Sequence, residues 1–234
     1  GYYHSLAIDS EGNLLGWGNN DCGQLGGKLS ITTNYIQLQS KREFKQVSAE
    51  YNHNLAIDNE GNLWAWGNND CGQLGDGTTE SKVEPAQIKT GMKFKQISAG
   101  DNHNIAIDSE KNLWTWGKNS HGQLGEGTTT NKLEPVQIKA GMEFVQISTG
   151  NNHSIAIDSK GNLWTWGADY DGQLGDGTTT NKNSPVQIKQ GTKFTQVSAG
   201  GEHNLAIDSE GNLWTWGCNT VGQLGDGTTT NKTS

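Results

Sequence analysis

A segment of about fifty residues recurs in near-identical form along the whole chain. One histidine marks each copy, and these are His4, His53, His103, His153 and His203. Successive histidines stand 49, 50, 50 and 50 residues apart. A fixed period of this length is typical of solenoids, propellers and repeat arrays. We therefore treat 1–234 as a single repeat domain, with units at 4–52, 53–102, 103–152 and 153–202 and a partial unit at 203–234.

Each unit contains four short strand signals separated by turn residues. In the second unit they lie at 54–57, 63–66, 86–89 and 94–98. Proline cannot donate to a β-ladder, so we expect Pro85 to stand at the start of the third strand. No helical period of 3.6 is sustained anywhere in the chain.

Four antiparallel strands per unit, repeated head to tail, are the pattern of a β-propeller. A β-solenoid of stacked coils is the alternative, although solenoid coils usually repeat at shorter periods. The fold class is therefore predicted as all-β, a β-propeller of four-stranded blades. The composition agrees with thin blades, because only 31% of residues are hydrophobic while nine Trp and 33 Gly are present.

Charge and cysteine content narrow the possible ligands and compartments. The net charge of -8 has the wrong sign for a surface that neutralises phosphates, so no direct binding to nucleic acid is expected. No apolar run reaches the ~20 residues of a spanning helix, so no membrane segment is expected. The three cysteines, Cys22, Cys71 and Cys218, fit neither a disulfide framework nor a zinc spacing. We expect free thiols in a reducing, cytoplasmic compartment.

Paired tryptophans recur in a Leu-Trp-x-Trp-Gly motif in every unit after the first. Residues two apart in a strand share a face, so each pair presents two indoles on one side of its blade. We interpret the pairs as packing between blades, because large aromatic side chains carry much of the burial in so lean a core. A stacking platform for sugars or bases is the alternative. The pairs are Trp64 and Trp66, Trp114 and Trp116, Trp164 and Trp166, and Trp214 and Trp216.

The periodic histidines are also interpreted as structural. A metal site is the alternative, since imidazole is the commonest side-chain ligand, but no second His or Cys stands at the spacing of zinc motifs. We expect buried imidazoles that hydrogen-bond to backbone. Neither a metal nor a cofactor is expected. No catalytic set is recognised, because the chain has no Gly-x-Ser-x-Gly elbow and no nucleophile motif surrounds His121.

Three motifs are linked at fixed spacing in the units: Ser-Ala-Gly-x-x-His-x-x-Ala-Ile-Asp, Gly-Asn-Leu-Trp-x-Trp-Gly and Gly-Gln-Leu-Gly-x-Gly. Residues 198–227 carry them almost complete. Together they resemble the repeat of the regulator of chromosome condensation family. This resemblance covers the whole chain and implies a β-propeller, with seven blades in the best-known members. Seven units would need about 350 residues on this period, so we expect these 234 residues to form part of a ring or an open arc.

The resemblance implies several alternative functions, because members of the family share a fold but differ in function. Fold alone does not settle function. The founding member of the family is a guanine-nucleotide exchange factor for the small GTPase Ran that docks on chromatin. Other relatives inhibit β-lactamases, serve as binding modules of ubiquitin ligases, or act as a plant photoreceptor. The exchange factor's wedge-like insertion has no counterpart in units of 49 or 50 residues, and neither a basic tail nor the photoreceptor's Gly-Trp-Arg-His-Thr run is present.

Differences between the copies indicate one candidate face. If the strands meander, the Ala-Gly-x-x-His loop and the long loop between Trp-Gly and Thr-Thr emerge together. These loops vary between copies, whereas the Asp-x-x-Gly-Asn turn of the other face barely changes. Neutral drift of surface loops is the alternative explanation. The expected partner-binding residues are Tyr2, Tyr3, Tyr51, Asp101, Asn151, Glu202, Asp21, His121, Tyr170 and Asp171.

The residue types on this face favour a protein ligand. Four of the five tyrosines lie in these loops, and Tyr is a favoured anchor at protein interfaces. Acidic residues, which favour a basic partner, are Asp21, Asp70, Asp101, Asp169, Asp171 and Glu202. The sequence thus predicts a non-catalytic propeller that binds a protein, either a basic surface or a small GTPase. The alternatives are an exchange factor for a Ras-like GTPase, such as a secreted bacterial effector, and a structural array.

Overall fold

The computed structural model describes residues 1–27, 30–39 and 42–234, and these residues form strands and turns without a helix. None of them therefore belongs to a helix that is long and apolar enough to cross a membrane. The strands group into five antiparallel sheets in which neighbours along the chain pair with one another. This arrangement confirms the prediction of an all-β chain built from repeated blades.

Three of the sheets have four strands, and the first and last have three. The first sheet contains β1 (His4–Ile8), β2 (Leu14–Asn19) and β3 (Ile31–Gln39). The second contains β4 (Phe44–Glu50), β5 (His53–Asp58), β6 (Leu63–Gly67) and β7 (Lys82–Ile88). The third contains β8 (Phe94–Ala99), β9 (His103–Asp108), β10 (Leu113–Gly117) and β11 (Lys132–Ile138). The fourth contains β12 (Phe144–Thr149), β13 (His153–Asp158), β14 (Leu163–Gly167) and β15 (Lys182–Ile188), and the fifth contains β16 (Phe194–Ala199), β17 (His203–Asp208) and β18 (Leu213–Gly217).

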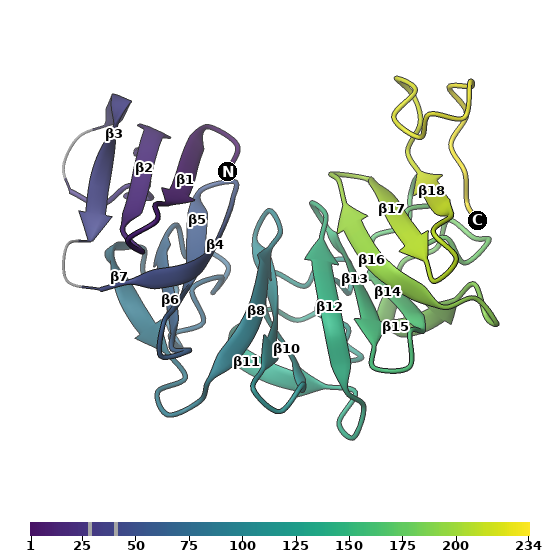
Figure 1. Ribbon diagram of the computed structural model, residues 1–234, viewed down its shortest axis with the longest axis horizontal. Coiled ribbons are helices and arrows are strands. Elements are labelled where there is room, and N and C mark those ends of the chain that lie inside the picture. Colours follow the sequence, from purple (N-terminus) through teal and green to yellow (C-terminus); the bar gives the residue numbers. More distant parts are fainter. Residues whose placement is uncertain (28–29, 40–41) are drawn as a thin grey trace.

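The five sheets stand side by side as blades along an open arc (Figure 1). Strands β4, β8, β12 and β16 are neighbours from blade to blade and line the inner side of the arc. The first and last blades lie at the two ends of the arc, which stay apart in Figure 1. Beyond β18, Lys232 forms a single bridge with Gly217 at the position where the other blades have their outer strand.

The boundaries of the sheets differ by one strand from the boundaries of the repeat units that we defined from the sequence. Strand β8 falls at the end of the unit 53–102, but it pairs with β9 of the next unit and not with β7. The turn at 89–93 therefore connects the outer strand of one blade to the inner strand of the next. Each unit as we drew it thus contributes three strands to one blade and one strand to its neighbour.

Pro85 lies inside a strand and not at its start, which corrects the expectation. Strand β7 begins at Lys82, and its pairing with β6 shifts register between Ala65 and Gly67. Three residues of β7, Pro85 among them, stand opposite the single residue Trp66 in this bulge. Strand β7 is also the outer edge of its blade. An edge bulge needs no donor from Pro85, because proline is tolerated at edges and bulges.

Each blade is joined to the next by buried side chains around one glutamine carbonyl. Between the second and third blades, the backbone oxygen of Gln73 accepts hydrogen bonds from Trp116 Nε1 at 3.0 Å and Asn104 Nδ2 at 2.7 Å. Asn104 Oδ1 lies 2.8 Å from His53 Nε2. We call these four residues and their equivalents the inter-blade latch. The equivalents are Gln24, His4, Asn54 and Trp66; Gln123, His103, Ser154 and Trp166; and Gln173, His153, Asn204 and Trp216.

The two indoles of each motif have different partners. Trp116 is fully buried against the apolar face of the preceding blade, beside Leu55, and enters the latch. Trp114 is half-buried, and its Nε1 donates to Asp108 of its own blade at 2.9 Å. The outer indoles that bond to their own aspartate are Trp64, Trp114, Trp164 and Trp214.

The imidazoles of His4, His53, His103 and His153 bond to a side chain of the next blade and not to backbone, which corrects the expectation. Asn104 Nδ2 donates to a carbonyl, so its Oδ1 must accept, and His53 Nε2 carries the proton. His53 Nδ1 is buried without a hydrogen-bond partner. The glycine of Ala-Gly-x-x-His packs on the ring, since a Cβ at Gly100 would lie 2.4 Å from Cε1 of His103.

We expect Asn104→Ala to lower the free energy of unfolding by about 2 kcal/mol, because it leaves buried His53 Nε2 without a partner and removes one of the two donors to the Gln73 oxygen. Urea unfolding followed by tryptophan fluorescence measures this change. Asn104→Ser is the matched variant, because Ser154 makes the equivalent bonds at 3.0 and 2.9 Å. Serine should recover part of the loss. Equal stability of the alanine variant and the original chain would contradict the latch.

The buried imidazoles predict a loss of stability in mild acid. Burial lowers the pKa of His53 and His153 to about 4 and that of His103 to about 3, from 6.5. Between pH 6.5 and 4 these imidazoles are therefore protonated in the unfolded chain but remain neutral in the folded chain. The free energy of unfolding should fall as the pH falls through this window, by about 1.4 kcal/mol per pH unit for each histidine.

Urea unfolding at a series of pH values measures this slope. Asp101, whose pKa is raised to about 6, acts in the opposite direction and offsets one histidine. His121→Asn is the control, because His121 is only half-buried and lies outside the latch. It should leave most of the slope in place. A flat profile between pH 6.5 and 4.5 would show that the imidazoles are not held neutral by burial.

Candidate functional site

The two sets of variable loops emerge at the same end of the arc. The strands of each blade meander, so the connections β4–β5 and β6–β7 leave at one end and the turn β5–β6 at the other. A hydrogen bond of 3.0 Å from Gln73 Nε2 to Asn102 Oδ1 joins the long loop of one blade to the short loop of the next. We call this end, with its short loops before the histidines and its long loops, the variable-loop end.

The residues predicted from the sequence to form a partner-binding face differ in their exposure to solvent. Tyr2 and Tyr3 are 62% and 68% exposed, and Tyr51 and Tyr170 are 42% and 64% exposed. Asp21 and Glu202 are also exposed. The half-buried residues are Asp101, Asn151, His121 and Asp171. Asp169, which we expected among the acidic surface residues, is fully buried and therefore presents no charge to a partner.

Three tyrosines form one aromatic cluster at the N-terminal side of this end. The rings of Tyr2 and Tyr3 meet edge to face with centroids 5.1 Å apart, and those of Tyr2 and Tyr51 do so at 5.8 Å. The cluster joins the first and second blades, since the N-terminus lies beside the β4–β5 connection (Figure 1). Exposed, contiguous aromatic rings of this kind are typical of binding surfaces.

A second aromatic group lies on the long loops. Tyr170 Oη stands 3.2 Å from His121 Nδ1, and the two rings meet edge to face at 5.7 Å. Asn181 Nδ2 donates to Tyr170 Oη at 3.2 Å. This group bridges the third and fourth blades.

The short loops follow one another around the inner side of the arc. The backbone amide of Asp101 donates to Asn151 O at 3.3 Å, and the amide of Asn151 donates to Gly201 O at 3.0 Å. One carboxylate oxygen of Asp101 is buried without a hydrogen-bond partner. Burial, together with the negative charges of Glu50 and Glu202, raises the pKa of Asp101 to about 6.

The short loop of the second unit departs from the others through Glu50, a residue that was not among the predicted site residues. Glu50 occupies the position of Gly100, where a side chain would collide with the imidazole. Strand β4 consequently extends to Glu50, which pairs with His53, and Tyr51 adopts a left-handed φ of 44°. The absence of this glycine from the second unit was the sequence signal that could have identified the loop. The replacement by Glu50 places an acidic side chain next to the exposed aromatic side chain of Tyr51.

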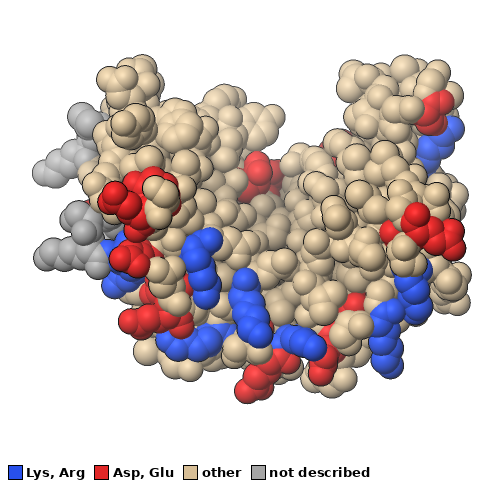
Figure 2. Space-filling view, in the orientation of Figure 1, with Lys and Arg blue, Asp and Glu red and all other residues tan. Residues whose placement is uncertain are grey.

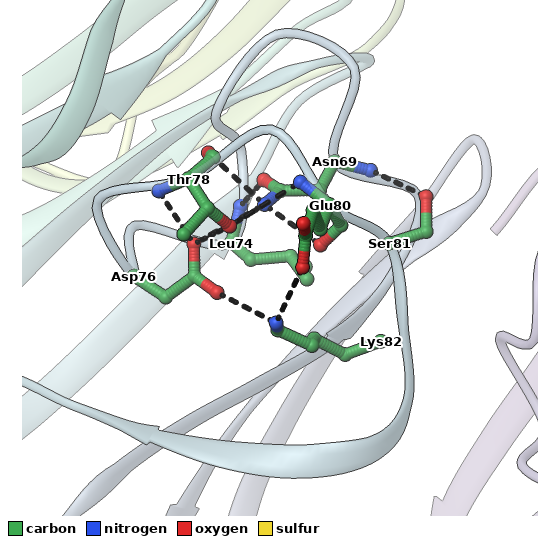
Figure 3. A network of polar contacts seen from close by, with 7 residues as sticks. All are labelled: Asn69, Leu74, Asp76, Thr78, Glu80, Ser81 and Lys82. Atoms are coloured by element: carbon green, nitrogen blue, oxygen red, sulfur yellow. Dashed lines mark hydrogen bonds and ion pairs between the residues drawn. The ribbon is translucent and has the colours of Figure 1, made fainter.

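The long loops are fixed from within by a polar network (Figure 3). Asn69 Oδ1 accepts from the amide of Leu74 at 2.9 Å, and Asn69 Nδ2 donates to the carboxylate of Asp76 at 3.2 Å. Asp76 also accepts from Thr78 Oγ1 at 2.7 Å and forms an ion pair of 3.5 Å with Lys82. This network holds the ends of the loop in place, and the charged groups Asp76 and Lys82 have their partners within the loop.

Among the described residues, one group of three could coordinate a metal ion: Asp171, Glu202 and Cys218, whose ligand atoms lie within 4.8 Å of one another. Two of these groups have protein partners, since Asp171 accepts from Asn231 at 2.8 Å and Cys218 Sγ lies 3.6 Å from Thr220 Oγ1. Burial and, after it, the nearby charge of Asp171 raise the pKa of Glu202. We assign no metal to this group.

The opposite end of the arc has hollows between its turns, one lined by Asp158, Asn162 and Trp164. The carboxylate of Asp158 is already engaged there, because it accepts from Asn162 Nδ2 at 2.8 Å and from Trp164 Nε1 at 3.1 Å. These side chains stabilise the turn. Figure 2 shows Lys and Arg interspersed with Asp and Glu along the lower part of the face in view.

Solved structures similar to this chain come from human and yeast proteins. Human WBSCR16 superposes with a TM-score of 0.89 at 22% identity, over 99% of this chain and 63% of that one. Yeast RCC1 (Prp20), solved bound to Kap60, gives 0.84 at 24% identity, over 99% and 58%. Prp20p of Saccharomyces cerevisiae, whose study also describes its binding to Gsp1p and histones, gives 0.83 at 24%, over 99% and 60%.

These likenesses concern the fold, and the chain spans about three fifths of the length of the proteins that it matches. Among curated proteins, a sequence comparison finds no match. The sequence profile of the RCC1-like domain matches residues 1–234, the whole chain. This match over the whole chain, together with the repeated blades of the structure, shows that the chain belongs to the RCC1-like domain family.

Proposed function

We propose that this chain is a non-catalytic protein-binding propeller that contacts its partner through the variable-loop end. The observation that carries the proposal is the placement of four exposed tyrosines, Tyr2, Tyr3, Tyr51 and Tyr170, in loops of this end. Tyrosine supplies a large contact area with a polar tip, which suits a protein interface. The latch tryptophans Trp66, Trp116, Trp166 and Trp216, by contrast, are at most 1% exposed, and Tyr35 on β3 is the one strongly exposed tyrosine of the described residues outside these loops.

A rigid base beneath variable loops supports the same function. The latch and the long-loop network hold the loop ends in place, so little conformational entropy is lost when a partner binds. A rigid scaffold that presents variable loops is a common design of binding proteins. The opposite end lacks this combination, because its repeated turns use their polar side chains internally.

We expect alanine variants of the exposed tyrosines to weaken capture of the partner at least tenfold, as loss of aromatic anchors usually does. The experiment immobilises the chain, quantifies the proteins retained from an extract of the source cells, and measures the affinity of the main captured protein. The test variants are Tyr2→Ala with Tyr51→Ala, and Tyr170→Ala. The controls at the opposite end are Glu110→Ala and Lys160→Ala, both of exposed residues.

The controls should keep the original affinity and all variants the original melting temperature. Loss of binding in the opposite-end variants, with full binding in the tyrosine variants, would contradict the proposed face.

Guanine-nucleotide exchange on a small GTPase is the second candidate. The observation that favours it is the similarity to Prp20p, a protein described as binding Gsp1p and histones. Release of a fluorescent guanine nucleotide from a panel of small GTPases, Gsp1p included, separates the two functions. Under the non-catalytic proposal the chain leaves the release rate unchanged. Acceleration would replace that proposal by the exchange function.

A further inference from the structure

The variable-loop end combines exposed aromatic rings with acidic side chains at its N-terminal side. We call Tyr2, Tyr3, Glu50, Tyr51 and Asp101 the aromatic-acidic rim. Its rings belong to two adjacent blades, and Tyr2, Tyr3 and Tyr51 remain 42–68% exposed although they touch edge to face. The face of an aromatic ring carries negative potential and attracts a cation.

The acidic half of the rim has fewer cations than anions: Lys118 acts on Asp101 and the N-terminal ammonium of Gly1 acts on Glu50, against the carboxylates of Glu50, Asp101 and Glu202. Asp101 is half-buried, and one of its carboxylate oxygens is buried without a hydrogen-bond partner. The charges that act on it are those of Glu50 and Glu202, which raise its pKa, and that of Lys118, which lowers it. Two negative neighbours outweigh one positive neighbour. The rim therefore holds an unneutralised negative charge at a partly desolvated position, where a cation from a partner would gain most.

The departure of the second unit from the repeat brings the two halves together. Glu50 takes the place of a glycine, and Tyr51 adopts a positive φ of 44°, which a bulky side chain rarely does. The equivalent residues Asp101 and Asn151 have no positive φ. This one loop thus supplies an acidic group whose charge acts on Asp101 and a ring that contacts Tyr2.

We propose that the aromatic-acidic rim receives an arginine side chain of the bound protein. This inference rests on the proposed function and names the chemistry of the partner. A guanidinium group stacks on aromatic faces and donates to carboxylates through a planar fork, so it can use both halves of the rim at once. A lysine ammonium is a compact, strongly hydrated charge without a stacking plane, and it fits the ring faces less well.

Titration of the ¹⁵N-labelled full chain with short peptides tests the inference. The probe is Ac-Gly-Ser-Gly-Arg-Gly-Ser-Gly-NH₂, and the matched controls carry citrulline or lysine in place of arginine. The arginine peptide should give saturable shifts at the backbone amides of Tyr51 and Asp101. The citrulline peptide, which has the same shape without the charge, should bind at least tenfold more weakly. Equal binding of the citrulline or lysine peptide would overturn the assignment to arginine.

Variants locate the site on the rim. Tyr51→Ala and Asp101→Asn should each weaken binding of the arginine peptide at least fivefold, while Tyr35→Ala, of an exposed tyrosine on β3, should not. Binding should also weaken as the pH is lowered from 7.5 to 5.5, because Asp101 gains a proton near pH 6, and Asp101→Asn should flatten this dependence. Unchanged binding in both rim variants, with melting temperatures retained, would overturn the proposal.

The outcome is separable from that of the proposed function. If the tyrosine variants abolish partner capture but the arginine peptide does not bind, the protein-binding face stands and the arginine assignment fails. If the peptide binds at the rim but the partner docks elsewhere, the proposed face fails instead.

Discussion

At each of the four junctions between described blades, one backbone oxygen, that of the glutamine in Gly-Gln-Leu-Gly, holds the repeat together. It is buried, so it would cost about 1–3 kcal/mol if left unpaired, and it receives both of its donors from the next blade. At Gln73 these donors are Trp116 and Asn104. The amide that donates must then accept with its oxygen, and this requirement fixes His53 as a neutral donor. A tryptophan donor, a neutral histidine, and an asparagine or serine that both donates and accepts thus meet around one carbonyl.

The side chain of the same glutamine decides which loop positions can vary. Gln73 Oε1 accepts from the amide of Cys71 at 2.8 Å, and Nε2 reaches Asn102 of the next blade. Gln24 and Gln123 reach Asn52 and Asn152 in the same way. The second residue of the short loop is therefore constrained at these junctions. The first residue, Tyr51, Asp101, Asn151 or Gly201, is outside the latch and can differ from blade to blade.

The period, three of the four strand positions in a unit and the end at which the loops gather could be predicted from sequence, because each depends on local patterns that repeat. The offset between units and blades could not be predicted, because a repeating pattern gives the length of the unit but not the residue at which a blade begins. The pairing of β8 with β9 depends on contacts between one unit and the next. Pro85 was misplaced because propensity rules give no bulge. Asp169 aligns with Asn69 of the loop network and is buried like it, so a surface reading of its charge was wrong. The side-chain partner of His53 lies 51 residues away and leaves no local signal.

Burial along the arc shows how far each blade depends on its neighbours. Trp17 is 37% exposed in the first blade, whereas its equivalent Trp66 is 1% exposed, and Leu213 is 63% exposed in the last blade, whereas Leu63 is fully buried. Stability in such repeats is approximately a sum over blades and junctions. The aromatic-acidic rim takes residues from the first three blades and so spans two junctions. A ligand that contacts Tyr2 and Asp101 together favours the state in which both latches are closed, and by mass action it stabilises those junctions. The loops that vary most are therefore coupled, through binding, to the latch that varies least.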